Sequence, residues 1–344
     1  MKYKSLTVLF VVLGFVLTTN TLLADSTRGW KPFKSQPKIC NWSEISSESA
    51  WGPRMSSVSF AFGNKVWIMG GYTNEGAKND IWYTGSRDGT EWKNIPLSLN
   101  SVRWSPRAAA SGIVFKNKIW VMGGYNAAFE SLNDVWSSHN GENWNQTTEH
   151  AQWSLRHGAS AIAYNVEGVK KMWIMGGGKP NENFGTLNDV WSSTDGANWT
   201  QEVAQAPWTP RRYSSLVEFK GKMFLLGGLD AGNNGLNDVW SSTDGITWTQ
   251  EVASAPWVGR GQHQTVVYNN KLWVMGGTIP HYPPSTSVHL NDVWSSSDGV
   301  NWTQEADASW AARELFSSVV SNSNIWVMGG AVNIATFSDV WKFN

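Results

Sequence analysis

Residues 156–199 read RHGASAIAYNVEGVKKMWIMGGGKPNENFGTLNDVWSSTDGANW, and the order of residue types in this segment predicts its strands and turns. Arg156 opens a run of small residues, and a short turn leads to a segment rich in strand-forming residues that ends at a diglycine. A variable segment is followed by Asp189-Val-Trp191, a tight Ser-Ser-Thr-Asp-Gly turn and Trp199. The stretch therefore predicts four short strands.

The same markers recur along the chain in the same order. Each copy has an arginine preceded three residues earlier by a tryptophan, then a diglycine, then an Asp-(Val/Ile)-Trp. The arginines are Arg54, Arg107, Arg156, Arg211, Arg260 and Arg313, and the aspartates are Asp80, Asp134, Asp189, Asp238, Asp292 and Asp339. Six copies of a four-stranded unit predict an all-β protein, a six-bladed β-propeller with four-stranded blades.

The two ends of the repeat array complement each other. The last copy stops after Asp339-Val-Trp341, with neither the turn nor the fourth strand of the other copies. Residues 40–43, Cys-Asn-Trp-Ser, match Ala197-Asn-Trp199-Thr200 and stand before the first copy. We therefore expect the N-terminal strand to close the last blade, which also covers edges that would otherwise pair with other chains.

Tryptophan is the most conspicuous component of the repeat. All 24 tryptophans except Trp30 occupy repeat positions. Repetition at core spacing favours packing between blades over carbohydrate stacking for most of them, with the tryptophans before the arginines as the possible exception. The small residues of each first strand fit the axis of a propeller, where bulky side chains would collide.

The N-terminus predicts export. Lys2 and Lys4 precede an apolar run at residues 6–17, and small and polar residues lead to Ala24. We expect cleavage after Ala24, giving a signal peptide (1–24), a linker (25–38) and the propeller (39–344). An uncleaved anchor is the alternative, although the apolar run is shorter than the ~20 residues of a spanning helix. The expected location is secreted or periplasmic, with no membrane span after cleavage.

Composition excludes several kinds of partner and site. Basic and acidic residues balance at 27 each, so no net field draws the chain to nucleic acid. The single cysteine, Cys40, excludes an internal disulfide framework. The six histidines show no paired spacing on one element, so no metal is predicted, and no other cofactor is expected.

The Arg-opened strand, the Ile-Trp-(Val/Ile)-Met-Gly-Gly and Leu-Asn-Asp-Val-Trp segments and the distal tryptophan together resemble the kelch repeat over residues 39–344. One departure is the Asp-Gly turn, which is similar to the Asp-box turn of sialidases; we expect Asp195, Asp244 and Asp298 to bond their own turn amides. The resemblance, to an exported bacterial-type kelch protein of the galactose oxidase/kelch superfamily, implies a recognition module for a protein segment or a glycan.

Strand direction places the loops before the first strands and after the diglycines on one face, where the sequence varies most. Two interpretations of the repeat arginines stay open: they satisfy carbonyls at blade junctions, or, as in kelch domains that capture acidic peptides, they form a cationic ring around the funnel. The candidate ligand-binding residues are Arg54, Arg107, Arg156, Arg211, Arg260, Arg313, His157, Tyr213, His263 and Glu314, with His281 and Tyr282 in the longest loop.

The resemblance also offers enzymes as alternatives. A galactose oxidase copper centre is not expected, because Cys40 is not at the axial site. A sialidase is not expected either, because Glu314 is the only acid next to a repeat arginine. A kelch-type sialic acid epimerase (mutarotase) would hold a carboxylate sugar on the arginines while a histidine or Glu314 moves a proton. We expect a non-enzymatic binding scaffold without assigned catalytic residues, with this epimerase as the alternative.

Overall fold

The computed structural model describes residues 41–97, 102–179, 185–280 and 286–344. The expected signal peptide (1–24), the linker (25–38) and Cys40 lie outside these ranges. Within them, no helix has the length and the apolar character needed to cross a membrane.

The described chain forms six four-stranded antiparallel sheets, here called blades 1 to 6 in chain order. Blade 1 consists of β2 (Val58–Phe62), β3 (Lys65–Thr73), β4 (Gly76–Thr84) and β5 (Lys93–Asn94). Blade 2 consists of β6 (Ser111–Phe115), β7 (Lys118–Met122), β8 (Val135–Ser138) and β9 (Trp144–Thr148). Blade 3 consists of β10 (Ser160–Val166), β11 (Val169–Met175), β12 (Val190–Ser193) and β13 (Thr200–Val203).

Blade 4 consists of β14 (Ser215–Phe219), β15 (Lys222–Leu229), β16 (Gly235–Ser242) and β17 (Thr249–Val252). Blade 5 consists of β18 (Gln264–Tyr268), β19 (Lys271–Ile279), β20 (Val288–Ser296) and β21 (Thr303–Gln304). Blade 6 consists of β22 (Ser317–Ser321), β23 (Asn324–Met328), β26 (Val340–Phe343) and β1 (Trp42–Ser46). A hairpin of β24 (Ala331–Val332) and β25 (Ala335–Thr336) lies between β23 and β26 in the chain.

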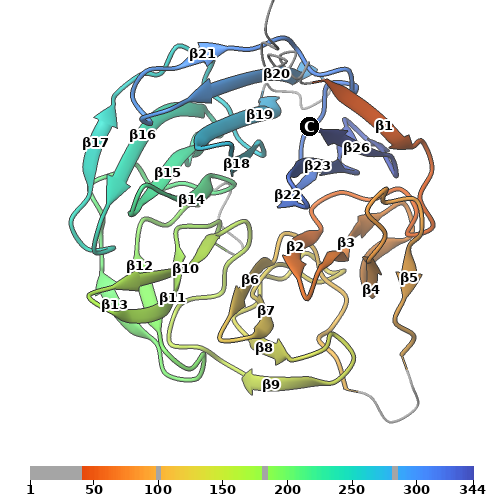
Figure 1. Cartoon of the computed structure of the whole chain (residues 1–344). Helices are drawn as coiled ribbons and strands as arrows, with labels where there is room; N and C mark the ends of the chain where they lie inside the picture. Colours follow the sequence, from red (N-terminus) through yellow and green to blue (C-terminus); the bar gives the residue numbers. More distant parts are fainter. Residues whose placement is uncertain (1–40, 98–101, 180–184, 281–285) are drawn as a thin grey trace, which may run out of the picture. The chain divides into compact units, whose positions relative to one another are not determined.

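The blades are arranged around a common axis, with the first strand of each blade innermost (Figure 1). Each innermost strand contacts the next in the order β2, β6, β10, β14, β18 and β22, and β22 contacts β2. The ring is therefore closed, and the six-bladed propeller predicted from the repeat is confirmed.

The N-terminal strand closes the last blade. β1 pairs antiparallel with β26, with Trp42 opposite Phe343 and Glu44 opposite Trp341. The Trp42 ring also lies edge-on to the ring of Trp310, with 5.7 Å between centroids. The closure predicted from the match between residues 40–43 and the fourth strands is confirmed.

A closed ring of backbone hydrogen bonds joins the blades at the axis. The residue two positions after each repeat arginine has a left-handed φ between 50 and 58°. Its N–H donates to the carbonyl of the equivalent residue in the preceding blade, at 2.8–3.1 Å. The six residues are Ser56, Ala109, Gly158, Tyr213, Gln262 and Leu315. Five of them are not glycine, so this axial ring holds backbone conformations that L-residues otherwise avoid.

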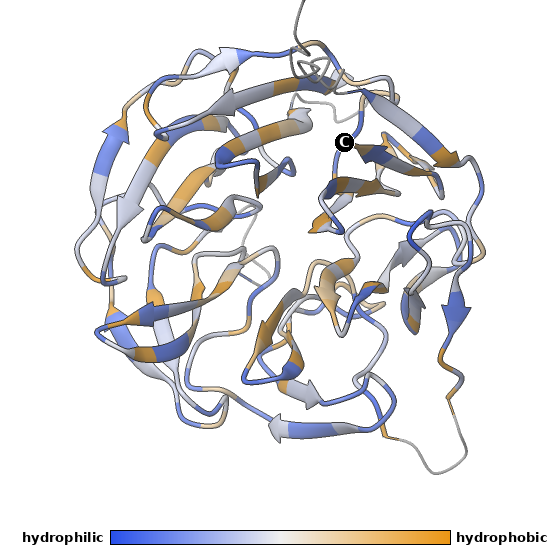
Figure 2. Ribbon diagram, viewed as in Figure 1, coloured by the Kyte–Doolittle hydropathy of each residue, from blue (hydrophilic) through white to orange (hydrophobic). Residues whose placement is uncertain are grey.

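The apolar core lies in the inner layers of each blade. Second strands such as β3 and β11 carry fully buried tryptophans, among them Trp67 and Trp173. Outermost strands such as β9 and β17 are largely hydrophilic (Figure 2). This layering explains why the repeat alternates runs of large apolar residues with polar fourth strands.

The Asp-Gly turns at the hairpin end of the blades are held by their own aspartates. Asp195 Oδ1 accepts the N–H groups of Ala197 and Asn198, both at 2.9 Å. Asp244 and Asp298 make the equivalent bonds. Hydrogen bonds from Asn198 hold the pKa of Asp195 at about 2. The structural role predicted for these aspartates is confirmed.

Candidate functional site

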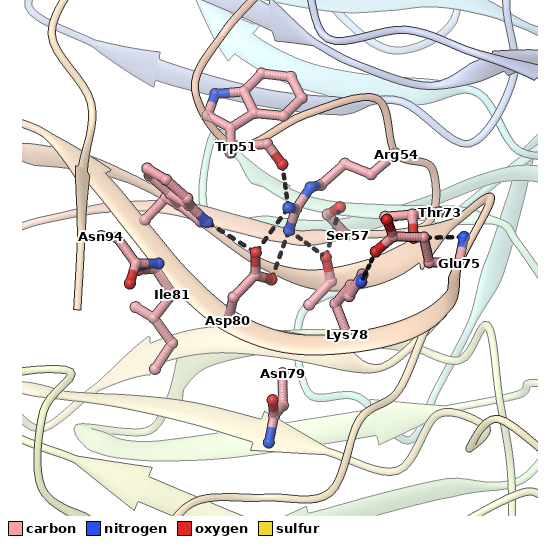
Figure 3. A network of polar contacts seen from close by, with 12 residues as sticks. Trp51, Arg54, Ser57, Thr73, Glu75, Lys78, Asn79, Asp80, Ile81 and Asn94 are labelled. Atoms are coloured by element: carbon pink, nitrogen blue, oxygen red, sulfur yellow. Dashed lines mark hydrogen bonds and ion pairs between the residues drawn. The ribbon is translucent and has the colours of Figure 1, made fainter. Parts of the chain in front are cut away.

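The repeat arginines lie inside the blades as the cationic halves of buried ion pairs. In blade 1, both carboxylate oxygens of Asp80 accept hydrogen bonds from Arg54 at 2.7 Å (Figure 3). The same guanidinium donates to the carbonyls of Gly70 and Trp51. Equivalent bidentate pairs join the other repeat arginines and aspartates: Arg107 with Asp134, Arg156 with Asp189, Arg211 with Asp238, Arg260 with Asp292 and Arg313 with Asp339.

These contacts leave the arginines little capacity for a ligand. Arg156 uses all five N–H donors, on the Ser154 carbonyl and hydroxyl, the Gly176 carbonyl and both oxygens of Asp189. The exposed fraction of the six repeat arginines lies between 0% and 3%. The tryptophans three residues before them, including Trp153, are equally buried and are packing residues.

The backbone of each repeat arginine bonds to the preceding blade. Arg107 N–H donates to the carbonyl of Lys78, and its own carbonyl accepts from Gly71, both at 2.9 Å. Each arginine thus joins two blades, through its backbone to one and its side chain to the other. The predicted cationic ring around the funnel is therefore wrong. An aspartate neutralises each guanidinium group, and burial makes the group inaccessible to a ligand. The alternative, a structural role at blade junctions, is what the contacts show.

His263 is likewise buried within the blades. It is 2% exposed, and its ring lies 6.4 Å from that of Trp257, between centroids. Neither ring nitrogen has a hydrogen-bond partner among the described residues. Phe316 occupies the equivalent position in blade 6 and packs against Trp310 in the same way. The ligand-binding role predicted for His263 is therefore corrected to a packing role.

The burial of His263 predicts acid-sensitive stability. Burial, with Arg260 nearby, lowers the pKa of His263 to about 3 in the fold, against about 6.5 in the unfolded chain. As the pH falls below about 6.5, the unfolded state takes up the proton first, so stability is lost between about pH 6.5 and about pH 3.

His263→Phe, which copies Phe316, is expected to remove this loss. From pH 7 to about pH 4.5, the unfolding free energy of the wild type should fall by about 2.5 kcal/mol more than that of the variant. Urea unfolding at the two pH values measures the difference. Equal acid sensitivity in both proteins would show that His263 takes up its proton in the fold.

A row of five aromatic rings lies at the end of the axis where first strands begin and second strands end, here called the loop face. In order, the rings belong to Tyr72, Phe129, Tyr125, His157 and Tyr213, and consecutive centroids are 5.6, 5.6, 5.7 and 6.0 Å apart. Phe129 is 66% exposed and the other four are partly exposed. We call this row the aromatic arc; it unites the predicted residues His157 and Tyr213 with three that were not singled out.

Local backbone features position the arc. Tyr125 directly follows the diglycine of blade 2, and its backbone pairs with Ala108, next to the repeat arginine. A Cβ on Gly158 would lie 2.7 Å from the Tyr213 ring, and a Cβ on Gly178 would lie 2.6 Å from the His157 ring. These two glycines of blade 3 therefore make the room that the aromatic rings occupy.

Glu314 and His289 form a second group on the loop face. Glu314 Oε1 lies 3.6 Å from His289 Nε2, which also accepts the N–H of Asn333 at 3.3 Å. Burial raises the pKa of Glu314, against the opposing effect of His289. We call these two residues the carboxyl–imidazole pair. Glu314 directly follows its repeat arginine and pairs with Ala331, as His157 of the arc does with Gly178, so the pair and the arc lie on the same face.

Burial strengthens the preference of two arc residues, Tyr125 and His157, for their uncharged forms. It raises the pKa of Tyr125 to about 12. It lowers the pKa of His157 to about 4, and the nearby Arg212 guanidinium adds to this effect. The arc therefore presents neutral hydroxyl and imidazole groups beside its apolar ring faces.

A cavity of about 230 Å³ runs along the axis. It is lined by the axial ring and the start of the six innermost strands, mostly through serine, alanine, glycine and glutamine. Tyr213 belongs both to this lining and to the aromatic arc. The small residues of the first strands thus leave an axial space, as the sequence suggested.

Two predicted site residues, His281 and Tyr282, lie outside the described residues. The residues that the sequence did not single out are Tyr72, Tyr125, Phe129 and His289. Each follows a diglycine in a segment that the sequence identified as variable, although in the structure Tyr72 lies in β3 and His289 in β20. The pattern does not tell which residues of these segments meet at the axis.

Comparisons with known proteins agree with the fold. Residues 158–344 match the model of the KLHDC2/KLHL20/DRC7 Kelch-repeats domain. The flagellar outer arm dynein alpha chain of Chlamydomonas reinhardtii is 27% identical in an alignment 154 residues long, which covers 42% of this chain and 3% of the dynein chain. The solved structure of YjhT superposes with a TM-score of 0.69 at 15% identity, over 86% of this chain and 96% of that one. At this identity the likeness to YjhT shows the fold alone, and the family match shows that this chain belongs to the kelch-repeat propellers.

Proposed function

We propose that this chain is a non-enzymatic binding module that takes a protein segment or a glycan onto the aromatic arc. The proposal rests on a difference in role between residues that repeat in every blade and residues that vary. The repeated arginines, aspartates and tryptophans make contacts within and between blades that hold the fold together. The arc uses side chains that differ from blade to blade at equivalent positions, such as His157 against Ala108.

The arc has the chemistry of a binding surface. Tyrosine and histidine offer an apolar ring with a polar edge, a combination enriched at recognition sites. Phe129 adds a large exposed apolar face in a left-handed conformation, with φ 62°, and such strained residues concentrate at functional sites. The fold thus supports a rigid platform, and the loops supply the contacts.

The proposed place of action is outside the cytoplasm, secreted or periplasmic. The support is the export signal predicted in residues 1–24. The balanced charge of the chain fits a partner recognised by surface complementarity rather than by a net field.

Peptide and glycan arrays probed with the purified protein test the proposal. The wild type should bind ligands of at least one class, and Tyr125→Ala and Phe129→Ala should each weaken that binding by about tenfold or more, as expected for aromatic anchor residues. Ile246→Ala is the matched control, because Ile246 is an apolar residue with 48% exposure in a hairpin turn at the opposite end of the blades. Binding that Ile246→Ala weakens and the two arc variants leave intact would place the ligand elsewhere and overturn the proposal.

A second candidate, a carbohydrate epimerase of the mutarotase type acting on a carboxylate sugar, is favoured by the carboxyl–imidazole pair. Burial raises the pKa of Glu314, and its carboxyl group lies 3.6 Å from the His289 imidazole, so two side chains of the kinds used for proton transfer stand close together. This activity is distinguished from binding alone by faster exchange between the α and β anomers in proton NMR spectra of the sugar.

A further inference from the structure

We propose that the aromatic arc and the carboxyl–imidazole pair bind different rings of one neutral pyranose oligosaccharide. The inference rests on the proposed function and names its ligand class. It follows from the juxtaposition, at one end of the axis, of flat apolar surfaces, neutral hydrogen-bonding groups and a buried carboxyl group.

The arc supplies the apolar part of the site. A pyranose has a face of C–H groups, and planar aromatic side chains bury such a face at a low cost in side-chain entropy. Phe129 and Tyr125 are stacked at an interplanar angle of 28°, and Phe129 is the most exposed ring of the arc. A sugar ring placed against Phe129 would also lie near the rings of Tyr72 and Tyr125, whose centroids are each 5.6 Å from that of Phe129.

The pair supplies directional hydrogen bonds. Carboxyl oxygens can each contact a neighbouring hydroxyl, and a protonated carboxyl group also donates. Glu314 Oε1 lies 3.6 Å from His289 Nε2, and that nitrogen accepts the Asn333 N–H. The partly buried carboxyl group has restricted freedom before a ligand arrives, which lowers the entropy cost of binding.

The charge of the site favours a neutral ligand. His157 and Tyr125 are uncharged at neutral pH, and burial favours the neutral form of Glu314. The Arg212 guanidinium carbon lies 6.0 Å from the centroid of the Tyr213 ring. This fixed cation donates to Asn233 Oδ1 at 2.7 Å and is faced by Asp230. Since Asp230 balances Arg212 within blade 4, an acidic sugar would bring a carboxylate into a site without surplus positive charge.

Titration calorimetry with a matched pair of probes tests the inference. The probes are a neutral galactose hexasaccharide and a galacturonate hexasaccharide of the same linkage, which differ in the carboxylates at C6. Neutral hexasaccharides of glucose and mannose are measured alongside. We expect at least one neutral hexasaccharide to bind, and the galactose probe to bind about tenfold or more tighter than the galacturonate probe at neutral pH.

Variants in the aromatic arc and in the carboxyl–imidazole pair measure how much each contributes to sugar binding. Phe129→Ala should weaken binding of the neutral probe by about tenfold or more. Glu314→Gln keeps the shape and neutral hydrogen bonding and should bind within about threefold of the wild type, whereas Glu314→Ala should lose about tenfold. Tighter binding of galacturonate, or a loss in Glu314→Gln as large as in Glu314→Ala, overturns the inference.

The array experiment keeps the two proposals distinguishable. If no neutral hexasaccharide binds while Phe129→Ala still abolishes binding to the peptide array, the sugar inference falls and the binding module stands. If neither class of array ligand depends on Tyr125 or Phe129, both fall.

Discussion

Arg156→Ala is expected to lower the free energy of unfolding by about 3–5 kcal/mol, because it leaves the carboxylate of Asp189 buried without its cation. Asp189 is 8% exposed, and Arg156 satisfies both of its oxygens at 2.8–2.9 Å. The same substitution also removes the hydrogen bond that the Gly176 carbonyl accepts from Arg156 at 2.9 Å. Equilibrium unfolding in urea measures the loss.

Two further variants make this test specific. Arg156→Lys keeps the charge but cannot reproduce the bidentate contact, so it should still be clearly destabilised. Glu142→Ala removes an exposed charge in a turn of blade 2 and should change stability by less than about 0.5 kcal/mol. A stable Arg156→Ala protein would mean that the guanidinium is available for other contacts, and the cationic ring would have to be reconsidered.

Gly124→Ala, in the diglycine of blade 2, is expected to cost about 4 kcal/mol. The residue has φ +92°, where a side chain is strained by about 1–2 kcal/mol. In addition, its Cβ would lie 2.6 Å from the Ala108 carbonyl oxygen and 2.9 Å from the Ala110 nitrogen. Both are backbone atoms next to the axial ring, so they cannot move without disturbing it.

Gly168→Ala is the matched control for this steric effect. Gly168 has a similar φ of +85° in the turn between β10 and β11, but nothing lies within 4 Å of a Cβ there. The free energy of unfolding of Gly168→Ala should therefore fall only by the cost of the left-handed backbone conformation, about 1–2 kcal/mol. Equal losses in urea unfolding for Gly124→Ala and Gly168→Ala would show that the diglycine is conserved along the repeat for backbone conformation alone.

The architecture was predictable because each blade needs the same contacts. Six equivalent blade junctions require six copies of the arginine, the diglycine and the aspartate. The number of copies in the sequence therefore gives the number of blades. The closure by β1 was predictable for the same reason, since Trp42 stands where a fourth-strand tryptophan was missing. Local chemistry at the turns, such as the bonds of Asp195, also followed from residue type.

The role of the arginines did not follow from the sequence, because repetition alone does not say whether a guanidinium points inward or toward the funnel. The partner was visible in the sequence as Asp189 and its equivalents, but the pairing depends on strand geometry. His263 was misassigned for a related reason. A histidine beside the axis faces either the ligand or the blade interior, and the packing of Phe316 at the equivalent position shows that it faces the interior.

The aromatic arc could not be predicted, because its members come from four blades and are brought together only by the closure of the ring. Tyr72 and Tyr213 are far apart in the sequence, yet a continuous row of ring contacts connects them in the structure. The sequence did hold an indirect signal. At positions next to the diglycines and the repeat arginines the residue differs from blade to blade, which indicates that the fold does not require a particular side chain there.

Repeated side chains build the propeller, and we propose that unrepeated side chains at the axis bind the ligand. A crystal structure with the tightest-binding array probe distinguishes the two roles. We expect the probe to contact Tyr125 and Phe129 on the loop face, with Arg156 still paired to Asp189. A probe bound at the hairpin-turn end of the blades, or Arg156 turned from Asp189 toward the probe, would contradict it.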